Sequence, residues 1–146
     1  MQMGLARTRT AVASLAVAAA SAGLVSCGGG GSGGDACSNG DGALDSAAFV
    51  FVQDPSSGKR VTSGFRVSGC SATFEATVDW RLRGKDRRTL AKGFTQGGSR
   101  EPGAFSFNVA YELRRLEVGT LEVSGPRVTS EGFAPPADVV PLVLEP

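Results

Sequence analysis

The hydrophobic and polar positions in the second half of the chain follow a period of two. The clearest case is the segment 71–83, where apolar and polar residues alternate strictly and the apolar phase holds Ala72, Phe74, Ala76, Val78, Trp80 and Leu82. Alternation of this length predicts a long β-strand with one buried face. We therefore expect Trp80 to point inward as a packing residue rather than to stack on a ligand.

Other segments show strand-like patterns, and clusters of Gly, Pro or Ser separate them. Residues 104–113 alternate with Phe105, Phe107, Val109, Tyr111 and Leu113 in phase, and the shorter candidates are 48–53, 61–68 (Phe65 and Val67 inward), 89–95 (Leu90 and Phe94 in phase), 119–123 and 139–144. No helical repeat follows residue 26. These segments predict an all-β fold, an immunoglobulin-like antiparallel β-sandwich of about seven strands. A small closed barrel is the structural alternative.

The N-terminal segment has a different pattern. Arg7 and Arg9 precede an uncharged, Ala-rich apolar run at 11–24, which ends in small residues. A basic region, an apolar region and small residues, in this order, are typical of a secretory signal peptide. The run is shorter than the roughly 20 residues that a transmembrane helix needs. A buried helix is the alternative interpretation.

The motif Leu24-Val25-Ser26-Cys27 resembles the lipobox of bacterial lipoprotein precursors. The resemblance implies that Cys27 becomes the first residue, is acylated and anchors the protein to a membrane, with the folded part periplasmic or on the outer surface. It divides the chain into a signal peptide (1–26), the lipidated Cys27 with a Gly-rich tether (27–46) and the sandwich domain (47–146). Secretion without a lipid, after cleavage near Ala18, Ala20 or Ala22, is the alternative.

The cysteine count agrees with lipidation. An exported protein with three cysteines has an odd one, and lipidation of Cys27 leaves Cys37 and Cys70 to form a disulfide in an oxidising compartment. Such a bridge would join the lead-in, the segment before the first predicted strand, to the corner before segment 71–83. It would not cross the core. Two free, buried thiols are the alternative.

The tether contains a glycine tract at 28–34, whose residues have no side chains to bury. Residues 39–45 are similar to part of a calcium loop, in which oxygen ligands alternate around a glycine turn. Cys37 and Ala48 occupy the first and last ligand positions, and neither supplies the required carboxylate. We therefore expect a polar, turn-rich lead-in and no metal.

Composition excludes several kinds of chemistry. The 15 basic and 14 acidic residues become 13 and 14 once Arg7 and Arg9 leave with the signal peptide, so the mature protein carries a formal charge of −1. A near-neutral protein is not expected to bind nucleic acid by bulk electrostatics. The absence of histidine excludes Ser-His and Cys-His nucleophilic pairs and His-based zinc sites. No glycine-rich phosphate loop precedes a helix, so we expect neither an enzyme nor a cofactor.

A cluster of basic residues is the candidate binding surface. It surrounds a predicted turn at Gly84 and contains Arg81, Arg83, Lys85, Arg87 and Arg88. Cations gathered at one hairpin would attract anionic lipid headgroups or anionic wall polymers of the envelope. The alternative interpretation is a solvated turn whose charges resist aggregation.

Several short motifs together resemble the immunoglobulin-like domain of bacterial spore germination proteins, over about 49–144. They are Val61-Thr62-Ser63, Val67-Ser68-Gly69, Ala72-Thr73-Phe74-Glu75-Ala76, Pro102-Gly103-Ala104-Phe105 and Gly119-Thr120-Leu121-Glu122-Val123. The resemblance implies an extracytoplasmic β-sandwich, often carried on lipoproteins, with an interaction role and no catalytic residues. We therefore expect a membrane-anchored module that binds another envelope protein or an anionic envelope polymer. The alternative is a structural or accessory envelope lipoprotein without a specific ligand, and a role in sporulation or germination rests on the resemblance alone.

Overall fold

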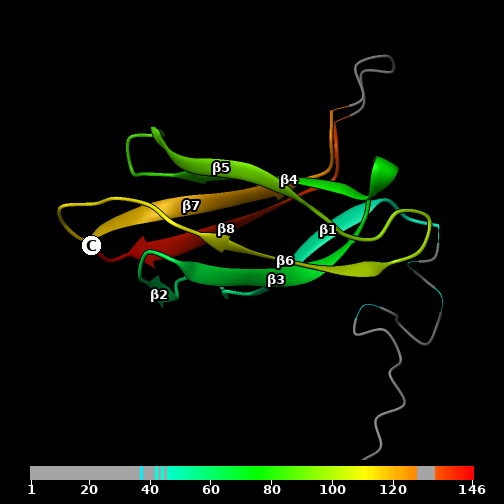
Figure 1. The fold of residues 1–146 in the computed structure, drawn as a ribbon, viewed down its shortest axis with the longest axis horizontal. Helices are drawn as coiled ribbons and strands as arrows, with labels where there is room; N and C mark the ends of the chain where they lie inside the picture. The colour runs from blue at the N-terminus through cyan, green and yellow to red at the C-terminus, as the bar shows by residue number, and fades with distance from the viewer. Residues whose placement is uncertain (1–36, 38–41, 43, 45, 128–133) are drawn as a thin grey trace, which may run out of the picture. The chain divides into compact units, whose positions relative to one another are not determined.

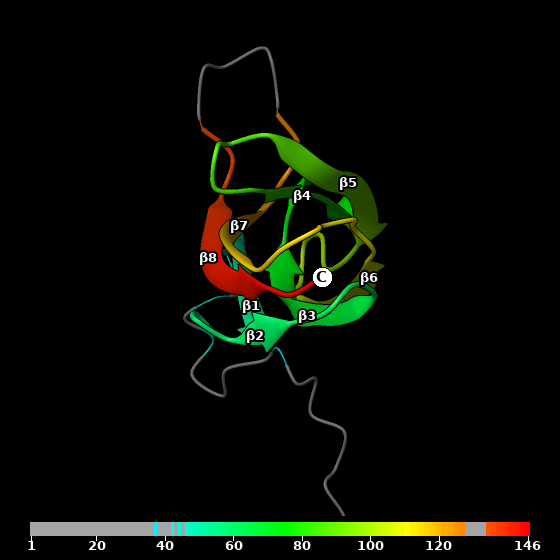
Figure 2. The same ribbon diagram turned by 90° about the vertical axis from the view of Figure 1, so that its left-hand side faces the viewer.

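Two β-sheets face each other in this protein, as the ribbon in Figure 1 and the end view in Figure 2 show. The computed structural model describes residues 37, 42, 44, 46–127 and 134–146. A three-stranded sheet has the order β1 (Phe49–Asp54), β3 (Phe65–Ala72), β6 (Gly103–Val109). A five-stranded sheet has the order β2 (Arg60–Val61), β8 (Ala137–Leu144), β7 (Glu117–Ser124), β4 (Thr77–Arg83), β5 (Thr89–Gln96). The described chain is thus an all-β, immunoglobulin-like sandwich, as predicted, with eight strands instead of about seven.

Neighbouring strands are antiparallel except at one edge, where β2 runs parallel to β8. The short strand β2 comes from the predicted segment 61–68, which a turn at residues 62–64 divides from β3. The predicted segment 104–113 is also shorter as a strand, because β6 ends at Val109. Tyr111 is nevertheless buried beyond that end.

The core lies between the inner faces of the two sheets. Its most deeply buried members are Val67, Val78, Leu82, Val109, Leu121, Val123, Leu142 and Leu144. Burying one such side chain contributes about 1.5–3 kcal/mol to folding. Trp80 of β4 stacks on Phe107 of β6, with ring centroids 4.8 Å apart, so it joins the two layers. This confirms the prediction that Trp80 points inward.

The prediction of one long strand over 71–83 is wrong. The chain leaves the three-stranded sheet after Ala72, forms the 3-10 turn η1 (Phe74–Ala76) and enters the five-stranded sheet at Thr77. Glu75 and Ala76 have φ angles of 55° and 57°, which reverse the backbone, and Phe74 is 62% exposed. The alternation of apolar residues continues through this turn, so the pattern alone could not reveal it.

A β-bulge changes the phase of β5. Leu82 pairs with Ala91 and Arg83 pairs with Thr89, so Leu90 is the extra residue. Leu90 and Ala91 both pack against the core, and every later residue of the strand changes face. Phe94, predicted in phase with Leu90, is therefore 74% exposed, which corrects that prediction.

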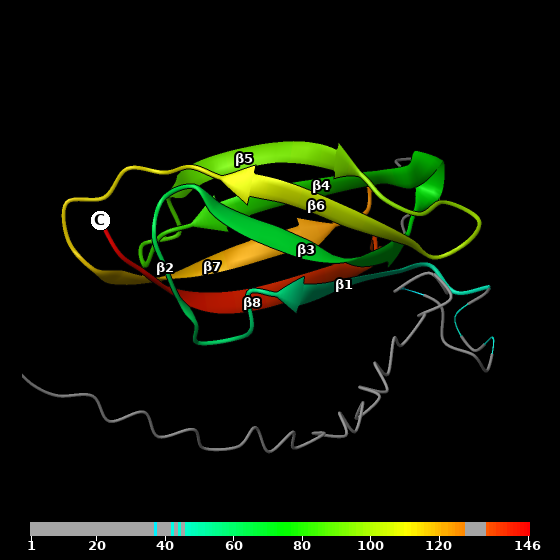
Figure 3. The ribbon, with the colours of Figure 1, turned by 60° about the horizontal axis from the view of Figure 1, so that its bottom comes forward.

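The connections gather at two opposite ends of the sandwich. The β4–β5 turn and the β6–β7 connection lie at one end, together with the C-terminus (Figure 1). The η1 turn and the start of the described chain lie at the other, and Figure 3 shows β1, β3 and β6 running between the ends. The strand pairing agrees with this arrangement. Thr77 pairs with Gln96 at the η1 end of β4, and Arg83 pairs with Thr89 at the end that carries the β4–β5 turn.

In the part of the chain that the structure describes, no helix is long and apolar enough to cross a bilayer. The predicted signal peptide, Cys27 and the glycine tract lie outside the described residues.

Candidate functional site

The β4–β5 turn, residues 84–88, holds the predicted basic cluster in a fixed geometry. The amide of Arg87 donates to the carbonyl of Gly84 at 2.9 Å, and the amide of Gly84 donates to the carbonyl of Arg88 at 2.9 Å. Arg87 has a φ of 63°, in the left-handed region that favours glycine. Oδ1 of Asp86 accepts from the amide of Arg88 at 3.2 Å, so the turn is closed by its own hydrogen bonds.

Two of the five predicted cations are neutralised by carboxylates from β7. Nε of Arg83 donates to Oε1 of Glu122 at 2.7 Å. Nη2 of Arg88 donates to Oε1 of Glu117 at 3.1 Å, and the Glu117 side chain is only 6% exposed. These contacts fix the turn against the sheet and remove Arg83 and Arg88 from the charge available to a ligand.

Asp86 adds a second carboxylate to Arg88, through a contact of 3.1 Å to Nη1. The backbone amide of Arg88 holds the pKa of Asp86 below its usual value. The hydrogen bond that the Arg88 guanidinium donates to the Asp86 carboxylate raises the pKa of Arg88 in turn. Both groups therefore stay charged, and their attraction stays local to the turn.

The other three predicted residues do not lie together. Arg81 projects from the outward face of β4, in register with Lys92 on β5 and Glu122 on β7. Lys85 and Arg87 are exposed at the tip of the turn, and neither takes part in an ion pair with a described residue. Within the described residues, Lys85 and Arg87 thus present unpaired positive charge at the tip of the turn, whereas the unpaired Arg81 lies apart from them on the face of the sheet.

The β6–β7 connection, residues 110–116, brings two arginines that the sequence analysis did not include. Arg114 and Arg115 are exposed and, within the described residues, take part in no ion pair. They line a surface hollow of about 860 Å³ whose wall also contains Lys85 and Arg88. We call Lys85, Arg87, Arg114 and Arg115 the cationic end. The adjacent arginine pair directly after a predicted strand was the available signal, but sequence could not show that it meets the β4–β5 turn.

The cationic end is continuous across the tip of the β4–β5 turn. Lys85 lines the hollow on the side of the β6–β7 connection and also a second hollow, shared with Arg87, on the other side. The acidic side chain of Glu112 is in the first hollow and reduces its positive charge. The end remains positive on balance, because the cations outnumber the carboxylates there: the cations are Arg83, Lys85, Arg87, Arg88, Arg114 and Arg115, and the carboxylates are those of Asp86, Glu112, Glu117, Glu122 and the C-terminal Pro146.

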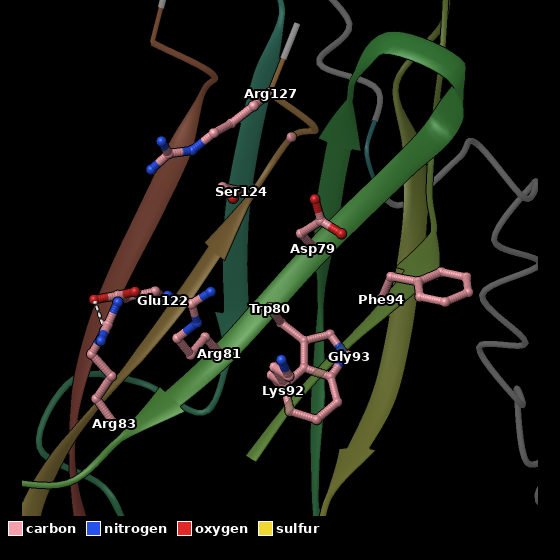
Figure 4. A pocket seen from close by; sticks show the side chains of 11 residues that line it. Asp79, Trp80, Arg81, Arg83, Lys92, Gly93, Phe94, Glu122, Ser124 and Arg127 are labelled. Atoms are coloured by element: carbon pink, nitrogen blue, oxygen red, sulfur yellow. Dashed lines mark hydrogen bonds and ion pairs between the residues drawn. The ribbon is translucent and has the colours of Figure 1, made fainter. Parts of the chain in front are cut away.

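A third hollow lies on the outward face of the five-stranded sheet (Figure 4). Its walls include Asp79, Arg81, Lys92, Phe94, Glu122 and Arg127. The dashed line in Figure 4 marks the Arg83–Glu122 pair, which crosses from β4 to β7. Charges of both signs alternate over this face. Unlike the cationic end, it therefore does not favour ligands of one charge.

The described residues contain no group of three or more Cys, Asp or Glu side chains placed to hold a metal ion. Of the calcium-like segment 39–45, only Gly42 and Leu44 are described. The expectation that this segment binds no metal therefore stays a prediction.

The predicted disulfide is present. Cys37 and Cys70 are bonded, with their Cα atoms 5.4 Å apart, and both residues are buried. Val67 and Gly69 of β3 face the core, where Gly69 lies against the ring of Phe105, so Cys70 faces outward. The bridge thus joins the lead-in to the outer side of the three-stranded sheet, at the end opposite the cationic end, and does not cross the core.

Comparison with known protein families supports the fold. Residues 49–127, more than half of the 146-residue chain, match the family described as the immunoglobulin-like domain of bacterial spore germination. The match ends before β8, whereas the resemblance was expected to reach residue 144. No curated protein sequence matches the chain. Among solved structures, CopC from Methylosinus trichosporium OB3b is similar, with a TM-score of 0.43 and 10% identity over 68% of this chain and 95% of that chain. The family match shows that the chain belongs to the family of immunoglobulin-like domains of bacterial spore germination.

Proposed function

We propose that this protein is a lipid-anchored, non-catalytic interaction module on the extracytoplasmic side of a bacterial membrane. The cationic end carries the binding role in this proposal. Lys85, Arg87, Arg114 and Arg115 are exposed on two connections that the sandwich holds side by side. Binding residues on connections that a rigid scaffold positions are a common arrangement in proteins.

Two observations support the location. The Cys37–Cys70 bridge is of a kind that forms and persists in oxidising compartments. Leu24-Val25-Ser26-Cys27 has the residues of a lipobox after a signal-like segment, and Cys27 is the remaining cysteine. An acylated Cys27 would put the sandwich outside the cytoplasm, where the bridge is stable.

Mass spectrometry of the native protein tests the anchor. We expect the mature chain to begin at Cys27 with a mass increase of a diacylglyceryl group, with or without a further acyl group. An intact leader, or an unmodified thiol at Cys27, would refute the membrane anchor and leave the fold untouched.

Affinity capture tests the interaction role. The mature domain with Cys27→Ser, immobilised and exposed to solubilised envelopes, should retain one component in a constant ratio. A variant with Arg114→Gln and Arg115→Gln should lose it, whereas Arg100→Gln with Arg127→Gln, which removes two exposed charges elsewhere, should not. Capture of nothing above background would refute the interaction role and favour an accessory structural lipoprotein.

A further inference from the structure

The attachment point and the cationic end lie at opposite ends of the sandwich. The lead-in is fixed by the Cys37–Cys70 bridge near the end of β3, where Ala72 pairs with Phe49. The chain then turns through η1 and follows β4 away from this end to the turn that carries Lys85 and Arg87. β4 has seven residues, so it separates the two ends by about 23 Å at 3.3 Å per residue.

The connection to the anchor and the cationic end are on opposite sides of the domain. Positions 27 and 37 are ten residues apart in the sequence, so an acylated Cys27 would be connected to the sandwich through the end that the bridge fixes. The cationic end is the opposite end, about 23 Å away along β4.

We infer that the cationic end binds a phosphate-bearing polymer of the envelope, at a distance from the membrane that holds the anchor. This inference rests on the proposed function and names its partner class. The four side chains fit a polymer better than a single small anion, because they are spread over two hollows that share Lys85. No enclosed pocket is needed for a ligand that lies across an exposed surface.

Phosphate matches the donors that the surface offers. Three of the four cations are arginines, whose planar guanidinium groups bind phosphate through two parallel hydrogen bonds. Arg88 cannot serve in this way, because Asp86 and Glu117 already occupy its guanidinium group. The pairing has a second effect, since it fixes the turn and so positions Lys85 and Arg87 before a ligand arrives.

Binding of poly(glycerol phosphate) to the mature domain with Cys27→Ser tests the partner class without any membrane. We expect saturable binding that weakens as salt increases. Arg114→Gln with Arg115→Gln should weaken it about tenfold, and so should Lys85→Gln with Arg87→Gly. Glycine at residue 87 accepts the left-handed φ, so the second pair keeps the turn even if the first disturbs its connection.

The matched control removes the same number of charges from elsewhere. Arg100 and Arg127 are exposed and lie toward the η1 end, beyond β5 and β7, so Arg100→Gln with Arg127→Gln should leave polymer binding unchanged. Equal weakening by the control and the cationic-end variants would overturn the site. Absence of polymer binding by the unaltered domain would overturn the partner class. If envelope capture still succeeded, the proposed function would stand with another partner.

A second arm tests the orientation with the full lipidated protein in vesicles. Phosphatidylcholine vesicles with and without phosphatidylglycerol should capture equal amounts of labelled poly(glycerol phosphate), because the cationic end lies beyond the screening length of about 8 Å at physiological salt. Loss of capture in the vesicles that contain phosphatidylglycerol would show that the cationic end folds back on its own bilayer. That result would overturn the inferred orientation and make anionic lipid the partner.

Discussion

Tyr111 fixes the point where three separate segments meet. Its hydroxyl lies 2.7 Å from the carbonyl oxygen of Val61 and 2.8 Å from that of Glu145, and its single proton serves one of them at a time. The backbone of Tyr111 exchanges hydrogen bonds with the hydroxyl of Ser63, at 2.9 and 2.7 Å. The residue thus joins the β6–β7 connection, which carries Arg114 and Arg115, to β2 and to the end of β8, the neighbouring strands at one edge of the five-stranded sheet.

Replacement of Tyr111 by Phe should lower the free energy of unfolding by about 1–2 kcal/mol, because a buried carbonyl loses its donor while the ring stays in place. Urea denaturation of the mature domain measures this loss. An unchanged unfolding midpoint would contradict the structural role of the hydroxyl.

The same residue predicts a pH dependence with a definite sign. Burial raises the pKa of Tyr111 above its ordinary value of 10.0. The folded state then holds the phenol proton more tightly than the unfolded state, so stability contributed by this group is complete below pH 10 and decreases as the pH rises beyond it. Tyr111 is the one tyrosine of the chain, so phenolate absorbance reports its titration directly, and the Tyr111→Phe domain should lose less stability between pH 9 and 11.

At the scale of elements, β4 and β5 pack closely because a small residue on one strand lies opposite a large residue on the other. Gly93 pairs with Trp80, and a Cβ atom at Gly93 would lie 2.7 Å from Cζ2 of the indole. The indole is held from its other side by Phe107, with the two rings within 8° of parallel. The bulge at Leu90 makes this possible, because it turns Gly93 inward and Phe94 outward.

Gly93→Ala should therefore destabilise the domain by about 1–3 kcal/mol, the usual cost of overpacking. Trp80 is the single tryptophan, so its fluorescence should change in the folded state as well. Lys92→Ala, at the neighbouring outward position, should stay within about 0.5 kcal/mol of the unaltered domain. Combination with Trp80→Phe should recover part of the loss, and an additive double variant would contradict a direct clash.

These two strands also show how far sequence reasoning reaches. Periodicity identified the β class, the sandwich, the inward Trp80 and most core residues, because each depends on alternation within one strand. It could not detect the η1 turn or the Leu90 bulge, since the apolar pattern continues through both. It also could not identify Glu117 and Glu122 as partners of Arg88 and Arg83, because those contacts come from pairing across the sheet.

At the scale of the whole molecule, the core and the disulfide are separate sources of stability. The core cluster fills the space between the sheets, with contributions from strands of both. The bridge instead lies on the outer side of the three-stranded sheet, next to β1, and ties down the lead-in. The sandwich should consequently fold without the bridge, although it should be less stable.

Replacement of both Cys37 and Cys70 by Ser, with Cys27→Ser in every protein compared, should cost about 2–4 kcal/mol, since the bridge closes a loop of 33 residues. Guanidinium denaturation measures the loss, and a domain unfolded at 25 °C would contradict an independent core. Polymer binding should be unchanged in this variant, because the bridge and the cationic end are separated by the length of β4. A loss of binding with the fold intact would mean that the two ends are coupled, and the cationic end could then no longer be treated as a preformed surface.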